Sequence, residues 1–304
     1  MAAVTAAMVK ELRESTGAGM MECKKALTET DGDMEAAVDV LRKSGAAKVE
    51  KKAGRIAAEG ITRVASEGNT AVVVEVNSET DFVAKNATFQ EFVQAVADKA
   101  LKASVDKAGD GEDVCAILDM QSELEEKTLT IGEKLSIRRF QKITGDCVAS
   151  YIHGGGRIGV LVAADGASND AIKEALTNVA MQIAALNPKY VSRDEVSADY
   201  IAHEKEILMA QIQNDPKESQ KPEKVINGMI EGRISKELKE VCLVDQVYVK
   251  AEDGKQTVAK YLDEVSKAVG CTVKVKRFVR FETGEGLEKK QEDFAAEVAA
   301  QMNA

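Results

Sequence analysis

An acidic residue and a large aromatic residue stand side by side where a strand should turn into a helix. The segment Thr80-Asp81-Phe82-Val83 follows the apolar run AVVVEV at 71–76, which is typical of a buried strand. An amphipathic helix is expected next, with its apolar face formed by Phe89, Phe92, Val93, Val96, Ala100 and Leu101. Such a corner could offer an aromatic ring and a carboxylate to a partner. Alternatively, Asp81 or Ser78 caps the helix while Phe82 packs onto the core, and the local pattern alone favours this packed arrangement.

A second candidate is the glycine run Gly154–Gly159, GGGRIG, which matches the pattern GxGxxG. A dinucleotide site needs a helix directly after the glycines, because the helix N-terminus receives the pyrophosphate. Here Val160-Leu161-Val162 continue as a strand, so a hairpin turn with positive φ explains the glycines better. An NAD(P)-dependent oxidoreductase is therefore a less favoured alternative. The sequence contains no GxxxxGK[ST] motif, which indicates that the chain has no phosphate-binding loop of its own.

The two histidines and five cysteines show no spacing that predicts catalysis or metal binding. His153 and His203 have no motif such as GxSxG to supply a nucleophile, so His153 is expected to be structural and His203 to be solvated. The scattered cysteines form neither a CxxC pair nor a Cys/His ligand set; they are Cys23, Cys115, Cys147, Cys242 and Cys271. Buried free thiols in a reducing compartment are expected, with no metal and no cofactor.

Composition places further limits on function. The 304 residues allow about two or three domains. The formal charge of −10, from 51 acidic and 41 basic residues, argues against a nucleic-acid-binding protein, which needs a basic surface. A local cluster of bases (Lys48, Lys51, Lys52 and Arg55) is explained as well by a solvated linker. No apolar run is long enough to span a bilayer, and the N-terminus lacks the apolar region of a signal peptide, so a cytoplasmic protein is expected.

The elements that position these candidates begin with three short helices between Thr5 and about Ser44, with Thr5 as the first N-cap. Met20 and Met21 follow Gly19 at a corner between helices, where they either form a flexible apolar docking surface or point inward. The Lys/Ala/Gly-rich segment 46–60 is expected to be a connector.

Two strand-strand-helix units are expected to follow, which predicts an α+β fold with antiparallel sheets. In the first unit, strands at 60–66 and 70–76 precede the corner and a helix that ends near Leu101. In the second, strands at 147–152 and 157–164 flank the glycine run and precede a helix at about 169–186. The region between the units contains a charged helical stretch at 112–127 and a candidate strand at 135–143.

The remaining chain predicts an antiparallel helical hairpin at 198–241, interrupted by Asp215-Pro216 and Lys221-Pro222. A strand at 247–249, a helix at 257–269, a strand at 271–282 and a C-terminal helix are then expected. The predicted division of the chain is 1–45 (bundle), 46–60 (linker), 61–145 (core N-subdomain), 146–197 with 242–286 (core C-subdomain), 198–241 (hairpin) and 287–304 (C-terminal helical module).

Four separated segments, in the same order along the chain, resemble the elongation factor Ts family. They are KELRESTGAGMMECKKAL at 10–27, TDFVAKNATF at 80–89, HGGGRIGVL at 153–161 and FVRFETGEG at 278–286. The resemblance implies that the N-terminal helices form a ubiquitin-associated-like bundle. It also implies a guanine-nucleotide exchange factor that binds GDP-bound elongation factor Tu and promotes GDP release in translation elongation, with no covalent chemistry of its own.

The same resemblance implies roles for individual residues. Thr80, Asp81, Phe82 and Val83 would disturb the Mg²⁺/phosphate site of the partner, and further partner contacts would be made by Met20, Met21, His153, Gly154 and Arg157. The alternative is a non-catalytic tethering protein that carries a ubiquitin-associated-like domain. Whether the hairpin dimerises the chain or binds the partner stays open, as does the choice between a homodimer and a two-plus-two complex.

Overall fold

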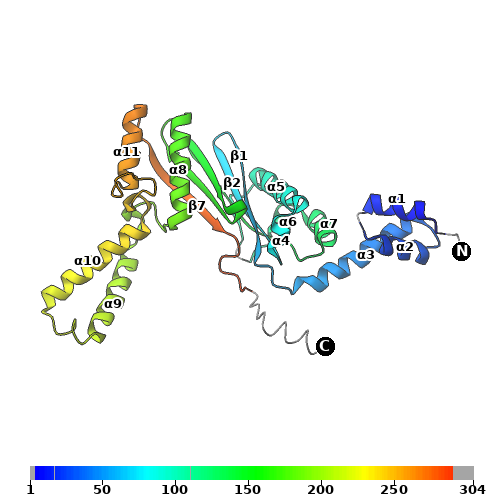
Figure 1. Cartoon of the computed structure of the whole chain (residues 1–304), viewed down its shortest axis with the longest axis horizontal. Coiled ribbons are helices and arrows are strands. Elements are labelled where there is room, and N and C mark those ends of the chain that lie inside the picture. Colours follow the sequence, from blue (N-terminus) through cyan, green and yellow to red (C-terminus); the bar gives the residue numbers. More distant parts are fainter. Residues whose placement is uncertain (1–3, 17, 110, 290–304) are drawn as a thin grey trace.

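Three helices form the N-terminal bundle of the computed structural model, which describes residues 4–16, 18–109 and 111–289 (Figure 1). They are α1 (Ala6–Thr16), α2 (Met20–Glu29) and α3 (Met34–Ala53). The Thr5 hydroxyl accepts a hydrogen bond from the Met8 amide, as predicted, and the Asp33 carboxylate caps α3 through the Ala36 amide. The small core contains Leu12, Cys23, Leu27 and Ala37. The third helix is longer than expected: it continues to Ala53, because the Lys/Ala-rich sequence beyond Ser44 favours helix.

The first sheet is antiparallel, in the order β1-β2-β4-β3. Its strands are β1 (Glu59–Glu67), β2 (Thr70–Ser78), β3 (Lys107–Ala108) and β4 (Ser136–Thr144). A one-turn helix, α4 (Asp81–Ala84), follows β2, and α5 (Ala87–Lys102) packs against β1 and β2. The predicted strand at 135–143 is confirmed as β4. The expected helical stretch at 112–127 is two helices, α6 (Val114–Ile117) and α7 (Gln121–Ile131), and β3 is an additional short strand.

The second sheet repeats this arrangement in the order β5-β6-β7. It consists of β5 (Cys147–His153), β6 (Ile158–Asp165) and β7 (Lys274–Glu282), with η1 (Gly154–Gly156) between β5 and β6. Helix α8 (Asp170–Leu186) packs on β5 and β6. The Asn169 side chain caps its first turn, and Asn187 ends it in a left-handed conformation before Pro188. The predicted α+β fold with duplicated strand-strand-helix units is therefore confirmed.

The two sheets pack face to face through an apolar layer. This layer includes Ala71, Val73, Ile143, Leu161 and Phe281. Separate hydrophobic clusters lie beneath α5 on the first sheet and beneath α8 on the second, so these helices cover opposite outer faces (Figure 1). Strand β2 is buried from Ala71 to Ser78 because it is covered on both faces, and this explains its nearly uninterrupted apolar sequence.

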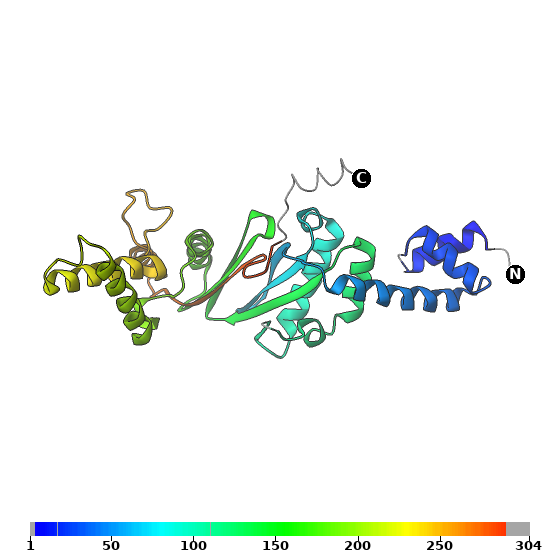
Figure 2. The ribbon, with the colours of Figure 1, turned by 90° about the horizontal axis from the view of Figure 1, so that it is seen from below.

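The predicted helical hairpin is confirmed as α9 (Ala198–Asn214) and α10 (Glu223–Val241). Its core contains Ile212, Ile230, Ile234 and Leu238. Figures 1 and 2 show it projecting from the end of the molecule opposite the bundle. Within the described residues, none of the helices combines the length and the apolar character needed to cross a membrane.

The chain returns from the hairpin through η3 (Leu243–Asp245) to α11 (Val258–Val269), where the helix predicted at 257–269 is confirmed. The strand predicted at 247–249 is wrong: within this described stretch, the chain forms an isolated bridge between Val247 and Thr257. Most of the predicted C-terminal helix at 287–304 lies outside the described residues, which end at 289.

Candidate functional site

The corner after β2 presents Phe82 to solvent, with 79% of its surface exposed. Thr80 has an extended backbone and precedes α4, whose Val83 is buried in the core cluster beneath α5. Asn86 caps the N-terminus of α5: its side-chain oxygen accepts hydrogen bonds from the Thr88 and Phe89 amides. The interpretation in which Phe82 packs onto the core while Asp81 or Ser78 caps the helix is therefore wrong.

Asp81 is exposed beside Phe82 and pairs with Lys85 one turn later. The Lys85 ammonium lies 2.8 Å from Asp81 Oδ2 and 5.8 Å from the centre of the Phe82 ring. The hydrogen bond from Lys85 lowers the pKa of Asp81 below its usual value, so this side chain is a carboxylate at neutral pH. The corner therefore combines an exposed ring with a fixed negative charge and a neighbouring positive charge.

The base of the corner is held by an acidic side chain that lies far away in the sequence. Glu133 Oε2 accepts hydrogen bonds from the amides of Glu79 and Thr80 at 3.0 and 2.9 Å, and Oε1 accepts one from the Thr80 hydroxyl at 2.6 Å. The Glu79 carboxylate in turn accepts from the Lys134 amide at 2.6 Å. Glu133 could not be recognised from the sequence, because a partner 53 residues away leaves no local pattern.

Met20 and Met21, at the start of α2, are 58% and 74% exposed. Cys23, Ala26 and Leu27 of the same helix point into the bundle core. The two methionines therefore form an apolar surface on the bundle, and the alternative in which both point inward is wrong.

The glycine run is a tight turn packed against β1. The Gly156 carbonyl accepts a hydrogen bond from the Thr62 hydroxyl at 2.8 Å, and a Cβ at Gly156 would lie 2.7 Å from Ile61 Cβ. Gly156 also has a φ of 109°, which disfavours any other residue. The turn leads directly into β6, so the predicted hairpin turn is confirmed and the helix that a dinucleotide site requires is replaced by a strand.

His153, Gly154 and Arg157 are exposed around this turn. His153 Nδ1 lies 3.0 Å from the Tyr151 hydroxyl, and Arg157 lies 3.8 Å from Glu282. The structure thus places the site residues on three parts: the bundle, the corner at α4 and the β5–β6 turn. The corner and the turn both border β1, through α4 and η1.

The other chemically capable groups are dispersed. All five cysteines are free thiols, and burial raises the pKa of Cys115 to about 11. His203 is exposed on α9, as expected. Across residues 4–16, 18–109 and 111–289, no group of three or more His, Cys, Asp and Glu side chains could hold a metal ion.

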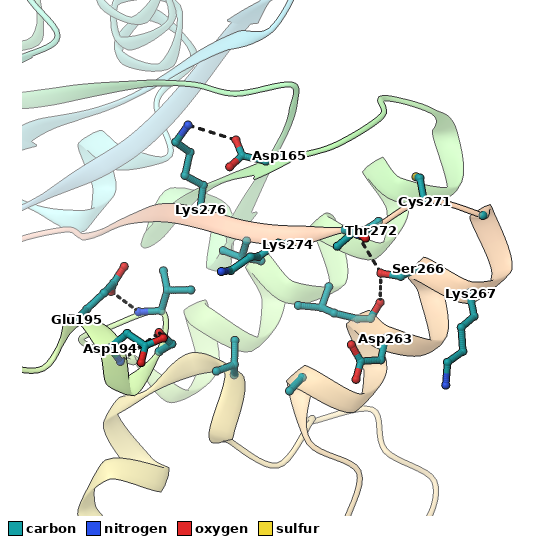
Figure 3. Close-up of a pocket in the computed structure, with 18 residues that line it drawn as sticks. Asp165, Asp194, Glu195, Asp263, Ser266, Lys267, Cys271, Thr272, Lys274 and Lys276 are labelled. Atoms are coloured by element: carbon teal, nitrogen blue, oxygen red, sulfur yellow. Dashed lines mark hydrogen bonds and ion pairs between the residues drawn. The ribbon is translucent and has the colours of Figure 1, made fainter.

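A groove of about 1120 Å³ lies between β7, α11 and the segment around Asp194 (Figure 3). Lysines and acidic side chains line it, together with apolar residues that include Val191, Leu262 and Val275. Lys276 lies 3.2 Å from Asp165, so part of this charge is already paired. The groove is separate from the corner, the methionines and the glycine turn.

Comparison with known proteins identifies the family. The family model described as "Elongation factor TS" matches residues 79–285. A protein named elongation factor Ts from Clostridioides difficile is 52% identical, over 99% of this chain and 100% of the relative. Proteins of the same name from Trichlorobacter lovleyi and Clostridium botulinum are each 48% identical, over 98% of this chain and 98% and 99% of the relatives. The chain belongs to the elongation factor Ts family.

Proposed function

We propose that this protein is the guanine-nucleotide exchange factor of elongation factor Tu: it binds the GDP-bound partner and promotes GDP release during translation elongation. Membership of the elongation factor Ts family supports this role. The observation that carries the proposal is Phe82, a large apolar side chain with 79% of its surface exposed on a one-turn helix. A free protein gains nothing from an exposed ring beside a carboxylate, whereas a docking protein can bury that ring against its partner.

Exchange of this kind needs differential binding and no covalent step. The factor must bind nucleotide-free elongation factor Tu more tightly than the GDP-bound form. By thermodynamic reciprocity, it then weakens GDP binding by the same factor. Weakening GDP binding by about ten-thousandfold requires about 5.5 kcal/mol of coupling. One well-packed aromatic contact supplies about 2–4 kcal/mol, so the corner and the docking surfaces must act together.

In this mechanism Phe82 inserts beside the Mg²⁺ and phosphate region of the partner. The Asp81 carboxylate, with Thr80 and Val83 forming the base of the corner, disturbs the groups that hold the ion. Loss of Mg²⁺ weakens phosphate binding because the ion neutralises much of the phosphate charge. The Lys85 ammonium, 2.8 Å from Asp81 in the free protein, must exchange this contact for a new one if Asp81 engages the partner.

Docking is assigned to two further surfaces. Met20 and Met21 would contact the nucleotide-binding domain of the partner, since flexible exposed methionines adapt to an apolar surface. His153, Gly154 and Arg157 would contact another part of the partner, together with the hairpin formed by α9 and α10. Nothing in this mechanism requires a cofactor or a metal ion held by the factor itself.

The test is release of a fluorescent GDP analogue from purified elongation factor Tu in excess unlabelled GDP, with this protein at about one-tenth of the partner concentration. Many-fold faster release of the whole bound pool shows turnover and supports the proposal. Detectable binding without faster release contradicts it and favours a tethering protein with a ubiquitin-associated-like domain. Faster release of only about one-tenth of the pool also contradicts a catalytic exchange factor.

A further inference from the structure

The turn between α7 and β4 carries Glu133, whose carboxylate accepts hydrogen bonds from Glu79 and Thr80 at the corner after β2. Helix α7 ends at Gly132, which has a φ of 89°, and this left-handed C-cap turns the chain so that Glu133 faces the end of β2. Glu133 is half-buried, and its carboxylate accepts from two backbone amides and one hydroxyl at 2.6–3.0 Å. Hydrogen bonds to an ionised acceptor are stronger than those between neutral groups.

The contact runs in both directions. Glu133 accepts from Glu79 and Thr80, and Glu79 accepts from the Lys134 amide at 2.6 Å. The carboxylate of Glu79 also lies 3.2 Å from Arg55. Two adjacent residues at the exit of β2 are thereby fixed to two adjacent residues before β4, although those strands are already paired along their length.

The same turn also reaches the end of the bundle helix. Lys134 Nζ donates to the carbonyls of Ala53 and Arg55, at 2.6 and 2.8 Å. These carbonyls stand at the C-terminus of α3, where a cation is favourable because helix-terminal carbonyls lack partners and carry negative partial charge. The turn therefore contacts both the corner after β2 and the end of α3, the last helix of the bundle that carries the two methionines.

From this geometry, and resting on the proposed function, we infer that Glu133 is a positioning residue for exchange: it holds Thr80 in the extended conformation from which α4 presents Asp81 and Phe82. Two of the three hydrogen bonds come from Thr80, immediately before the functional pair, and the third comes from Glu79. Fixing the corner in advance removes an ordering cost that would otherwise fall on the step in which the corner displaces GDP from the docked partner. Glu133 itself lies at the base of the corner and acts through Asp81 and Phe82.

The first test measures the corner in the free protein and needs no nucleotide assay. Hydrogen–deuterium exchange is followed at the amides of Glu79 and Thr80, which donate to Glu133. In Glu133→Gln, the neutral amide oxygen is a weaker acceptor than the ionised carboxylate, so exchange at these amides should accelerate about tenfold or more. Glu126→Gln is the matched control, because Glu126 is an exposed acid of α7 that pairs with its neighbour Lys127. Unchanged protection in Glu133→Gln would overturn the inference.

The second test separates positioning from docking and from general stability. The rate of GDP release is measured against factor concentration. A loosened corner should lower the maximal release rate about tenfold and change the half-saturating concentration less than about threefold. Ile183→Val serves as a control, because it removes one methylene group from the core beneath α8, away from the corner, and so lowers stability alone. It should lower the melting temperature and leave the maximal release rate unchanged.

A mutant cycle with Asp81→Asn and Phe82→Ala completes the test. If Glu133 acts through this pair of residues, adding Glu133→Gln to a variant that already carries both Phe82→Ala and Asp81→Asn should change the release rate less than about twofold. An additional tenfold loss in that background would overturn the inference. So would a maximal GDP-release rate in Glu133→Gln equal to that of the unmodified protein. If the unmodified protein fails to accelerate release, the proposed exchange function is refuted by that result alone. The hydrogen-exchange measurement still decides whether Glu133 holds the corner.

Discussion

Replacing Phe82 with alanine removes the ring and leaves the backbone of the corner in place. A phenylalanine side chain offers about 200 Å² of surface, and 79% exposure leaves about 160 Å² for a partner to cover. At about 25 cal/mol per Å², complete coverage would be worth about 4 kcal/mol. Fixing the side chain and incomplete contact reduce this to about 2–3 kcal/mol. If that energy is realised as GDP leaves, the maximal release rate should fall about 30- to 150-fold.

The assay is stopped-flow release of a fluorescent GDP analogue at several concentrations of factor, with binding to GDP-bound elongation factor Tu measured separately by calorimetry. Binding should weaken less than about threefold, because the ring's contact belongs to the state with displaced nucleotide. Stability should change by less than about 0.5 kcal/mol, since the ring is exposed in the free protein. Val105→Ala is a matched control that shortens an apolar side chain 41% exposed after α5. Equal losses of binding and release in Phe82→Ala would refute the reasoning.

Four further predictions concern other parts of the protein. Asp81→Asn should slow GDP release about tenfold. Because Lys85 lowers the pKa of Asp81, the carboxylate of the unmodified protein is protonated only at a pH below the usual pKa of aspartate. The contribution of this carboxylate to the release rate should therefore be constant between about pH 6 and 8. A decline in that contribution across this range in a release-rate profile would contradict the assignment. Met21→Ala should raise the half-saturating factor concentration several-fold at an unchanged maximal release rate, whereas a lower maximal rate would place this methionine in the exchange step. Gly156→Ala should destabilise the protein by about 1–3 kcal/mol in urea unfolding, because its Cβ would meet Ile61 and its φ is 109°, and full stability would contradict the close packing of the turn. Cys115, with a pKa raised by burial to about 11, should resist a thiol reagent at pH 8 until the protein unfolds, and fast native modification would contradict its burial.

Local sequence signals predicted most of the fold. The helix predicted at about 169–186 is α8, and the structure caps its two ends with Asn169 and Asn187. The two hairpins were recognisable because apolar runs flank turn residues. In each of these cases the decisive interactions lie within a few residues of one another.

The errors arose where the pattern of burial and the backbone structure diverge. Val247-Tyr248-Val249 alternates in exposure as a strand would, with the two valines about half exposed and Tyr248 buried. Tyr248 is buried by stacking on the Tyr261 ring at 4.3 Å, and this contact needs no strand partner. The alternation of side chains in the sequence therefore predicted their burial correctly, but it predicted a strand where the chain forms an isolated bridge.

The sequence singled out candidate residues at the corner but predicted their geometry only in part. The acid–aromatic corner was identified from its position between a strand and a helix, but its local pattern favoured a packed Phe82. In the structure the ring is exposed while Val83 fills the core, and Glu133, in the turn before the neighbouring strand β4, accepts a hydrogen bond from the Thr80 amide. Both depend on the tertiary arrangement, which a single sequence does not display.

The most direct test of the account compares the affinity of this protein for nucleotide-free and for GDP-bound elongation factor Tu, alongside the affinity of the partner for GDP with and without the factor. Differential binding requires the two ratios to be equal, because they are two sides of one thermodynamic cycle. We expect the nucleotide-free partner to bind the factor about 10³–10⁴-fold more tightly than the GDP-bound form does, and the factor to weaken GDP binding by the same amount. Equal affinity for the two forms of the partner would contradict exchange by differential binding.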